Sequence, residues 1–111
     1  MDEIILCAAI WYKELDKLSP KWEGVVSFTR PINTLEGIVL CGYRHPSCMY
    51  QMIAITGKRS VELECGKYIQ GFLTNKNKFV NREEAWLIAE KAGQIKQQSG
   101  GHGTLYSEDL Y

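Results

Sequence analysis

The chain has 111 residues, which is enough for one domain, 1–111, with a single hydrophobic core. Hydrophobic residues make up 45% and charged residues 23% of the sequence, as is typical of a folded globular protein. The 13 Lys and Arg balance the 13 Asp and Glu, and a net charge of zero excludes the broad basic field of proteins that bind long nucleic acids. The longest apolar run, residues 4–12, is shorter than the roughly 20 residues of a membrane-spanning helix. We therefore expect an intracellular protein that contacts neither long nucleic acid nor membrane.

Two strands are predicted in the first half of the chain. Residues 4–12 (IILCAAIWY) are almost entirely apolar, and a short run of this kind predicts a central strand that is buried on both faces. A variable connection over 13–36 follows, with Pro, Gly and Asn spread through it. Residues 37–44 (GIVLCGYR) predict the second strand, which ends at turn-forming residues and delivers Arg44 and His45 to an edge of the sheet.

A short helix and a hairpin are predicted next. Pro46 at a first helical position, apolar residues at the i, i+3, i+4 spacing and a terminating Gly57 predict an amphipathic helix over this stretch. Residues 67–80 predict a β-hairpin, because two apolar runs flank a polar turn at 75–77.

The second helix has the clearest start in the sequence. Asn81 is a favourable N-cap, Glu84 stands at the third helical position as in a capping box, and Gly93 ends the helix. Small residues form the stripe that would face the sheet. Trp86 and Leu87 lie outside this stripe, so another element or a partner subunit must cover them.

These elements together predict an α+β fold with a small antiparallel sheet and two helices. The C-terminal residues divide into a flexible polar linker over 96–104 and an aromatic docking tail over 105–111. Zero net charge combined with 11% aromatic residues disfavours a soluble monomer. We therefore expect a homo-oligomer, either a dimer or a hexamer.

The cysteines are expected to be reduced core thiols. Cys41, His45 and Cys48, with Cys65 further along, could nominally supply a zinc site, but their spacing does not match a zinc knuckle. A nucleophilic Cys–His pair would need an orienting group and an oxyanion donor, and the sequence shows no signature of either. We therefore expect no metal, no cofactor and no catalytic residue.

Arg44 and His45 directly precede a predicted helix N-terminus. The unpaired N–H groups and the dipole of such a terminus favour an anion, and a neighbouring guanidinium makes the position a plausible phosphate site. A surface salt bridge made by Arg44 is an equally good interpretation. The sequence contains neither a P-loop nor a dinucleotide-binding fingerprint, so a nucleotide would have to be held in another way.

An aromatic residue with nearby amides could read a purine base. Phe72 could stack on the base while the amide of Asn81 or Gln70 hydrogen-bonds its edge, although ordinary strand packing explains Phe72 equally well. Arg82 stands in the first helical turn, where the dipole disfavours a cation, which gives it a modest claim to function.

A small acidic cluster lies in the tail at Ser107, Glu108 and Asp109. Adjacent carboxylates could serve as a catalytic or metal-binding pair. In a terminal segment they more often make docking contacts to backbone N–H groups or to Arg.

The order of these motifs resembles a known phage family. CAAIWY, GIVLCGYRH, YIQGFLTNKNKFVNREEAWLIAEKAGQIK and the terminal LYSEDLY are together similar to the Thoeris anti-defence sponges of the first type. The resemblance covers about three quarters of the chain and excludes 13–36.

The resemblance implies a non-catalytic protein of the host bacterial cytoplasm that binds cyclic ADP-ribose isomers, such as glyco-cyclic ADP-ribose, without cleaving them. It further implies assembly of dimers into hexamers and, in some members, a second site for CBASS cyclic di- and trinucleotides. By motif position, the ligand-binding residues would be Arg44, His45, Phe72, Asn81 and Arg82. On this interpretation Arg44→Ala and Phe72→Ala each weaken ligand binding without unfolding the protein.

Two other classes of function stay open. A cyclic-nucleotide hydrolase would use His45, Glu108 and Asp109 as acid–base groups and would show a pH-dependent rate. A protein-interaction inhibitor of a host factor would use Trp86, Leu87 and the aromatic tail.

Overall fold

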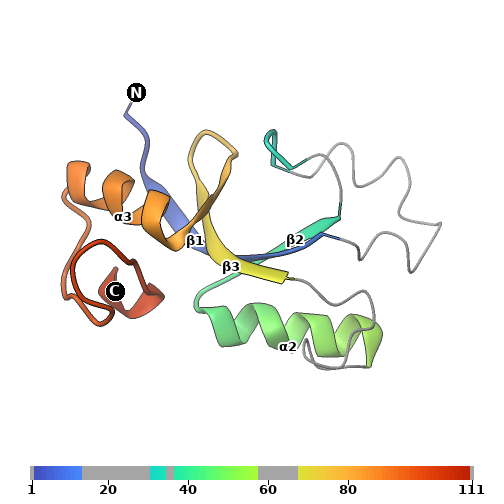
Figure 1. Cartoon of the computed structure of the whole chain (residues 1–111). Coiled ribbons are helices and arrows are strands. Elements are labelled where there is room, and N and C mark those ends of the chain that lie inside the picture. The colour runs from blue at the N-terminus through green and yellow to red at the C-terminus, as the bar shows by residue number, and fades with distance from the viewer. Residues whose placement is uncertain (1, 14–30, 35–36, 58–67, 111) are drawn as a thin grey trace.

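The computed structural model describes residues 2–13, 31–34, 37–57 and 68–110, with the side chains of residues 55 and 56 left out (Figure 1). Four strands form one antiparallel sheet in the order β2-β1-β3-β4. The strands are β1 (Ile5–Tyr12), β2 (Ile38–Gly42), β3 (Tyr68–Thr74) and β4 (Phe79–Asn81). The helices are α2 (His45–Thr56) and α3 (Arg82–Lys91), followed by the short 3-10 helix η4 (Ser107–Asp109). The predicted α+β class, with an antiparallel sheet and two helices in one small domain, is confirmed.

Strand β1 lies inside the sheet, as its apolar sequence predicts. It pairs with β2 on one side and with β3 on the other, so that Ala8 lies opposite both Gly42 and Phe72. Ala8, Ala9 and Ile10 are fully buried. The expected burial of β1 on both faces is only partly seen, because Leu6 is 49% exposed and Cys7 and Trp11 are half-buried.

The helix boundaries follow from local chemistry. Helix α2 begins one residue before the predicted Pro46, and Gly57 ends it in the left-handed conformation with its N–H donating to the Ile53 carbonyl at 2.7 Å. Helix α3 begins with the predicted capping box. The Glu84 N–H donates to Asn81 Oδ1 at 2.8 Å, and the Asn81 N–H donates to Glu84 Oε1 at 3.0 Å.

The core lies between one face of the sheet and the two helices. Ala8, Ile10 and Tyr12 alternate along β1 and therefore share a face, and all three belong to the hydrophobic core cluster. Helix α2 packs against β1 and β2, and α3 packs against β3, β4 and β1. Figure 1 shows α2 running along the sheet and the C-terminal segment curled beside α3.

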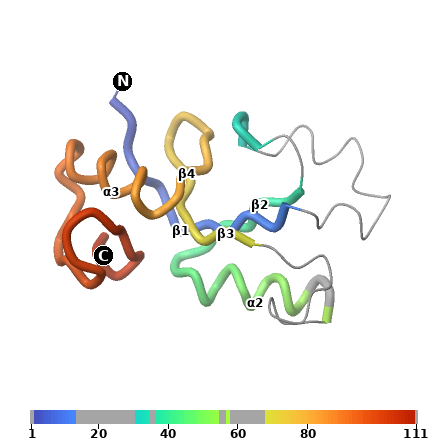
Figure 2. Tube along the Cα trace, viewed as in Figure 1, coloured from blue at the N-terminus to red at the C-terminus, as the bar shows by residue number. Residues whose placement is uncertain are grey.

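The hairpin and a short connecting segment define the β4 edge. The turn between β3 and β4 uses Asn77 in the left-handed conformation, at φ 58 (Figure 2). The side-chain amide of Asn33 donates to the Phe79 carbonyl at 2.6 Å and accepts from the Phe79 N–H at 2.8 Å. It therefore satisfies the backbone of β4 at the edge of the sheet. Of the predicted connection over 13–36, residues 14–30 and 35–36 lie outside the described residues.

The C-terminal segment folds back over α3. Leu105 and Leu110 enter the core cluster, and the buried carboxylate of Asp109 accepts hydrogen bonds from the N–H groups of Ser99 at 2.7 Å and Tyr106 at 2.9 Å. Trp86 is only 1% exposed, so other residues of the same chain cover the side chain that lies outside the small-residue stripe of α3. Leu87 is 67% exposed and remains outside the packing.

Across the described ranges, none of the helices has the length and apolar character needed to cross a membrane.

Candidate functional site

Arg44 and Tyr43 form a corner at the point where β2 passes into α2, with Tyr43 exposed and Arg44 half-buried. Arg44 is the N-cap residue of α2 in an extended conformation, and its guanidinium lies 4.9 Å from the centroid of the Tyr43 ring. Tyr43 is 63% exposed, whereas Arg44 is half-buried. The first turn of α2, all of it described, contains no acidic residue. This corner therefore places a cation and an accessible aromatic ring at a helix N-terminus, where an anion is favoured.

His45 joins the start of α2 to the middle of the sheet. Its side chain is buried, and Nε2 lies 2.7 Å from the carbonyl oxygen of Gly71. Because a carbonyl only accepts, Nε2 carries the hydrogen in this contact. Burial lowers the pKa of His45 below 6.5, and the positive charge of Arg82 lowers it further, against the opposing effect of the Gly71 hydrogen bond.

The depressed pKa of His45 predicts a stability that falls in mild acid. The unfolded chain binds a proton at His45 near pH 6.5, whereas the folded chain binds it only at a lower pH. The free energy of unfolding is therefore retained above pH 6.5 and falls as the pH drops through the folded pKa, by at most about 1.4 kcal/mol per pH unit for one proton. Urea denaturation at several pH values measures the slope.

The variant His45→Gln is the matched control for this pH dependence, since Gln retains an N–H donor but does not titrate. Its free energy of unfolding should be flatter with pH over the same range. An identical pH profile in the wild-type protein and in this variant would show that His45 is not the titrating group.

Gly71 lies at the centre of the candidate site, where it contacts His45 and pairs with Asn81. A Cβ at this position would lie 2.1 Å from the Val80 carbonyl oxygen and 2.7 Å from the ring of Phe79, so no larger residue fits. The close approach sets the β3–β4 pairing and presents the Gly71 carbonyl to His45. Sequence reasoning missed this role, although a glycine inside a strand is a signal of close backbone approach.

The structure places Phe72 in the hydrophobic core. Its side chain is 0% exposed and belongs to the core cluster, with its ring in an edge-to-face contact with His45 at 5.1 Å between centroids. In this conformation neither face of the ring is open to a base. This burial favours the packing interpretation of Phe72 and leads us to expect that Phe72→Ala loses stability, whereas a role of Phe72 in ligand binding stays a prediction. Two tyrosines in or next to α2 have accessible rings, Tyr43 at 63% and Tyr50 at 73% exposed, and Tyr43 is the one beside Arg44 at the start of the helix.

Arg82 ties the C-terminal segment to the sheet. Its guanidinium donates to the Leu105 carbonyl at 2.9 Å and to Gln70 Oε1 at 2.6 Å, and it lies 4.3 Å from the centroid of the Tyr106 ring. Burial lowers the pKa of Arg82 from its usual value, and the oxygen of Tyr106 acts in the opposite direction. These contacts explain why a cation stands in the first turn of α3.

Asn81 is exposed and its side-chain oxygen caps α3. It lies directly opposite Gly71 in the pairing of β3 with β4. The fold thus gathers four of the predicted residues around the middle of β3. His45 hydrogen-bonds the Gly71 carbonyl, and Phe72 follows Gly71 in the strand. Arg82 donates to the side chain of Gln70, and Asn81 pairs with Gly71 across β3 and β4. Arg44 adjoins this group through the chain, at the corner that it forms with Tyr43.

In the acidic cluster of the tail, packing buries one carboxylate and leaves the other exposed. Asp109 is 0% exposed and binds backbone N–H groups, as the docking interpretation expects, whereas Glu108 is exposed. Among the residues that the structure describes, no three His, Cys, Asp or Glu side chains are grouped so that they could hold a metal ion. Cys65 lies outside the described residues.

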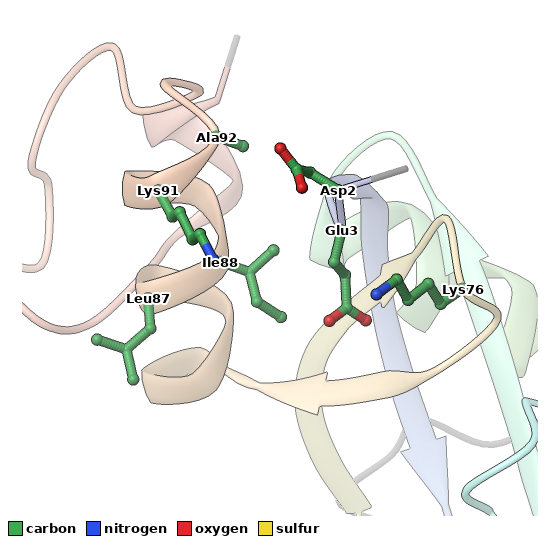
Figure 3. A pocket seen from close by; sticks show the side chains of 7 residues that line it. All are labelled: Asp2, Glu3, Lys76, Leu87, Ile88, Lys91 and Ala92. Atoms are coloured by element: carbon green, nitrogen blue, oxygen red, sulfur yellow. The ribbon is translucent and has the colours of Figure 1, made fainter.

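A separate cleft of about 330 Å³ lies between α3, the N-terminal residues and the hairpin turn (Figure 3). It is lined by Asp2, Glu3, Lys76, Leu87, Ile88, Lys91 and Ala92. Charges of both signs border its apolar floor. None of the five predicted site residues lines this cleft.

The comparison with known families gives a match over nearly the whole chain. A family model described as phage T4 y16D protein matches residues 4–111. The chain belongs to the phage T4 y16D protein family. Neither a curated protein nor a solved structure matches it. The match makes the y16D-family chain a phage protein, in agreement with the phage origin implied by its motifs.

Proposed function

We propose that this phage protein binds and sequesters a cyclic nucleotide immune signal of the cyclic ADP-ribose type in the cytoplasm of the host, without cleaving it. The resemblance of its ordered motifs to Thoeris anti-defence sponges supplies the ligand class, and membership of a phage family agrees with it. We extend the proposal to CBASS cyclic di- and trinucleotides as further ligands and to assembly as a homo-oligomer.

The observation that carries the proposal is the corner formed by exposed Tyr43 and half-buried Arg44. A cyclic ADP-ribose isomer presents a diphosphate and an adenine base. The Arg44 guanidinium at the start of α2 offers charge-assisted hydrogen bonds to a phosphate, and the exposed ring of Tyr43 offers a stacking surface to a base. Diphosphate and base are thus matched by adjacent residues.

Sequestration is favoured over hydrolysis by the state of two of the three possible acid–base groups, the third being the exposed Glu108. His45 is buried against the Gly71 carbonyl, and Asp109 is fully buried on backbone N–H groups. A general acid or base must reach the reacting atoms of its substrate within hydrogen-bond distance, and these two side chains are occupied away from the surface.

The direct test is to identify what the protein retains. The purified protein is mixed with a panel of cyclic ADP-ribose isomers and cyclic di- and trinucleotides, unbound material is removed, and the protein is denatured by heat. Mass spectrometry then identifies the released molecule. Release of an intact panel member supports sequestration, a molecule of changed mass indicates an enzyme, and an empty protein contradicts the proposal and favours a host-protein partner.

Replacing Arg44 should weaken nucleotide binding more than replacing a lysine elsewhere on the surface does. We expect Arg44→Ala to raise the Kd for the retained nucleotide about 10- to 100-fold, which corresponds to one or two charge-assisted hydrogen bonds to phosphate. Isothermal titration calorimetry measures the Kd, and thermal denaturation checks that the variant is folded.

The variant Lys76→Ala is the matched control for Arg44→Ala. Lys76 is an exposed cation that lines the separate cleft. Its replacement should leave the Kd unchanged. If Lys76→Ala weakened binding while Arg44→Ala did not, the nucleotide would belong to that cleft, and the role of the Tyr43–Arg44 corner would be wrong.

A further inference from the structure

Two cysteines meet on the face of the sheet that points away from the core cluster. Cys41 of β2 lies opposite Ala9 of β1, and Cys7 is two residues before Ala9 on the same strand. Side chains two residues apart on a strand share a face, so Cys7 and Cys41 are diagonal neighbours across the β1–β2 pair. Both are free and half-buried.

The neighbouring thiols influence each other's ionisation. The Cys41 thiol favours the thiolate of Cys7 and lowers the pKa of Cys7 from 9.0 to about 7, against the opposing effect of burial. The same interaction, together with burial, raises the pKa of Cys41. Near neutral pH Cys7 is therefore a thiolate in a large fraction of molecules, with a thiol already beside it.

Cys48 provides a contrast within the same protein. It is fully buried on α2, and its Sγ lies 3.7 Å from the Ala8 carbonyl oxygen. Burial raises the pKa of Cys48 to about 11. It has the properties of a structural thiol, because the protonated form is neither nucleophilic nor accessible.

We propose that Cys7 and Cys41 form a reversible disulfide when the protein meets an oxidant of the disulfide class, such as glutathione disulfide. The Cys7 thiolate attacks one sulfur of the oxidant, forming a mixed disulfide and expelling one glutathione thiolate. Cys41 then loses its proton to solvent and attacks the Cys7 sulfur, which expels the second glutathione. The protein loses two hydrogens and two electrons, and the oxidant becomes two molecules of glutathione.

The geometry favours a disulfide that is readily reduced. Diagonal neighbours on paired strands lie about 7–8 Å apart, slightly beyond the Cα separation of an ordinary disulfide. Strand β2 pairs with a single neighbour, β1, in the described sheet, so no other described strand fixes its position. Disulfides that hold their partners under strain are reduced readily. The bridge would also fix the end of β2, which leads directly to the Tyr43–Arg44 corner.

The test uses the full chain carrying Cys65→Ser, which removes the one cysteine outside the described residues. This protein is treated with glutathione disulfide near neutral pH, the remaining thiols are blocked, and peptides are mapped by mass spectrometry without reduction. Cys7→Ser and Cys41→Ser are each added in turn, and Cys48→Ser is the matched control.

We expect a peptide that joins Cys7 to Cys41 in the starting protein and in the Cys48→Ser variant, and its loss after dithiothreitol. The Cys7→Ser variant should react with glutathione disulfide much more slowly, and the Cys41→Ser variant should stop at the glutathione adduct on Cys7. Absence of the bridge in a folded, treated protein, or a bridge that involves Cys48, would overturn the proposal.

Discussion

Phe72→Ala is expected to lower the free energy of unfolding by about 3–5 kcal/mol, because it removes a fully buried aromatic ring from the core. The ring lies between Ala8 of β1 and Val80 of β4 in the sheet and contacts the edge of His45 at the start of α2. Its loss opens a cavity where the sheet and α2 meet. Chemical denaturation followed by circular dichroism measures the change.

The variant Leu87→Ala separates burial from side-chain size in this experiment. Leu87 is a large apolar residue that is 67% exposed on α3, and its removal should change the free energy of unfolding by less than about 0.5 kcal/mol. Equal losses for the two variants would contradict the assignment of Phe72 to the core. Nucleotide binding by Phe72→Ala is informative only under conditions in which that variant is folded.

Asp109→Ala is expected to destabilise the protein by about 3 kcal/mol or more, because two backbone N–H groups lose a charged acceptor. The carboxylate is 0% exposed and binds the N–H groups of Ser99 and Tyr106, which closes the C-terminal segment into a loop over α3. Release of that loop uncovers Trp86. Equilibrium unfolding measures the loss of stability. In a chain that also carries Trp11→Phe and Trp22→Phe, a red shift of tryptophan emission reports the exposure of Trp86.

The neighbouring acid Glu108 is the matched control for Asp109. Its side chain is exposed, so Glu108→Ala removes the same charge without removing the buried acceptor. We expect its unfolding free energy and tryptophan emission to stay near those of the wild-type protein. A similar loss in both variants would mean that net charge, and not the backbone hydrogen bonds of Asp109, holds the segment in place.

The candidate site was predictable where it depends on chain order. Arg44 precedes the helix because a strand-forming run ends there and Pro46 can open a helix, and both signals lie within a few residues. The placement of His45 on Gly71 was not predictable, since these residues are 26 positions apart and an atom-scale approach joins them. Phe72 illustrates the same limit, because an aromatic residue in a strand is equally suited to either face until the register is known.

The sequence by itself determined which segments form the elements and several of their ends, although β2 ends at Gly42, two residues before its expected end. The turn at 75–77, the capping box of Asn81 with Glu84 and the stop at Gly57 all depend on contacts between residues close in the chain. Tertiary structure alone decided which side chains are covered. Gln94 holds both backbone groups of Ile5 at 2.8 Å across 89 residues, and the C-terminal segment covers Trp86. Such contacts depend on the shapes of surfaces assembled from distant segments, and local patterns contain no information about them.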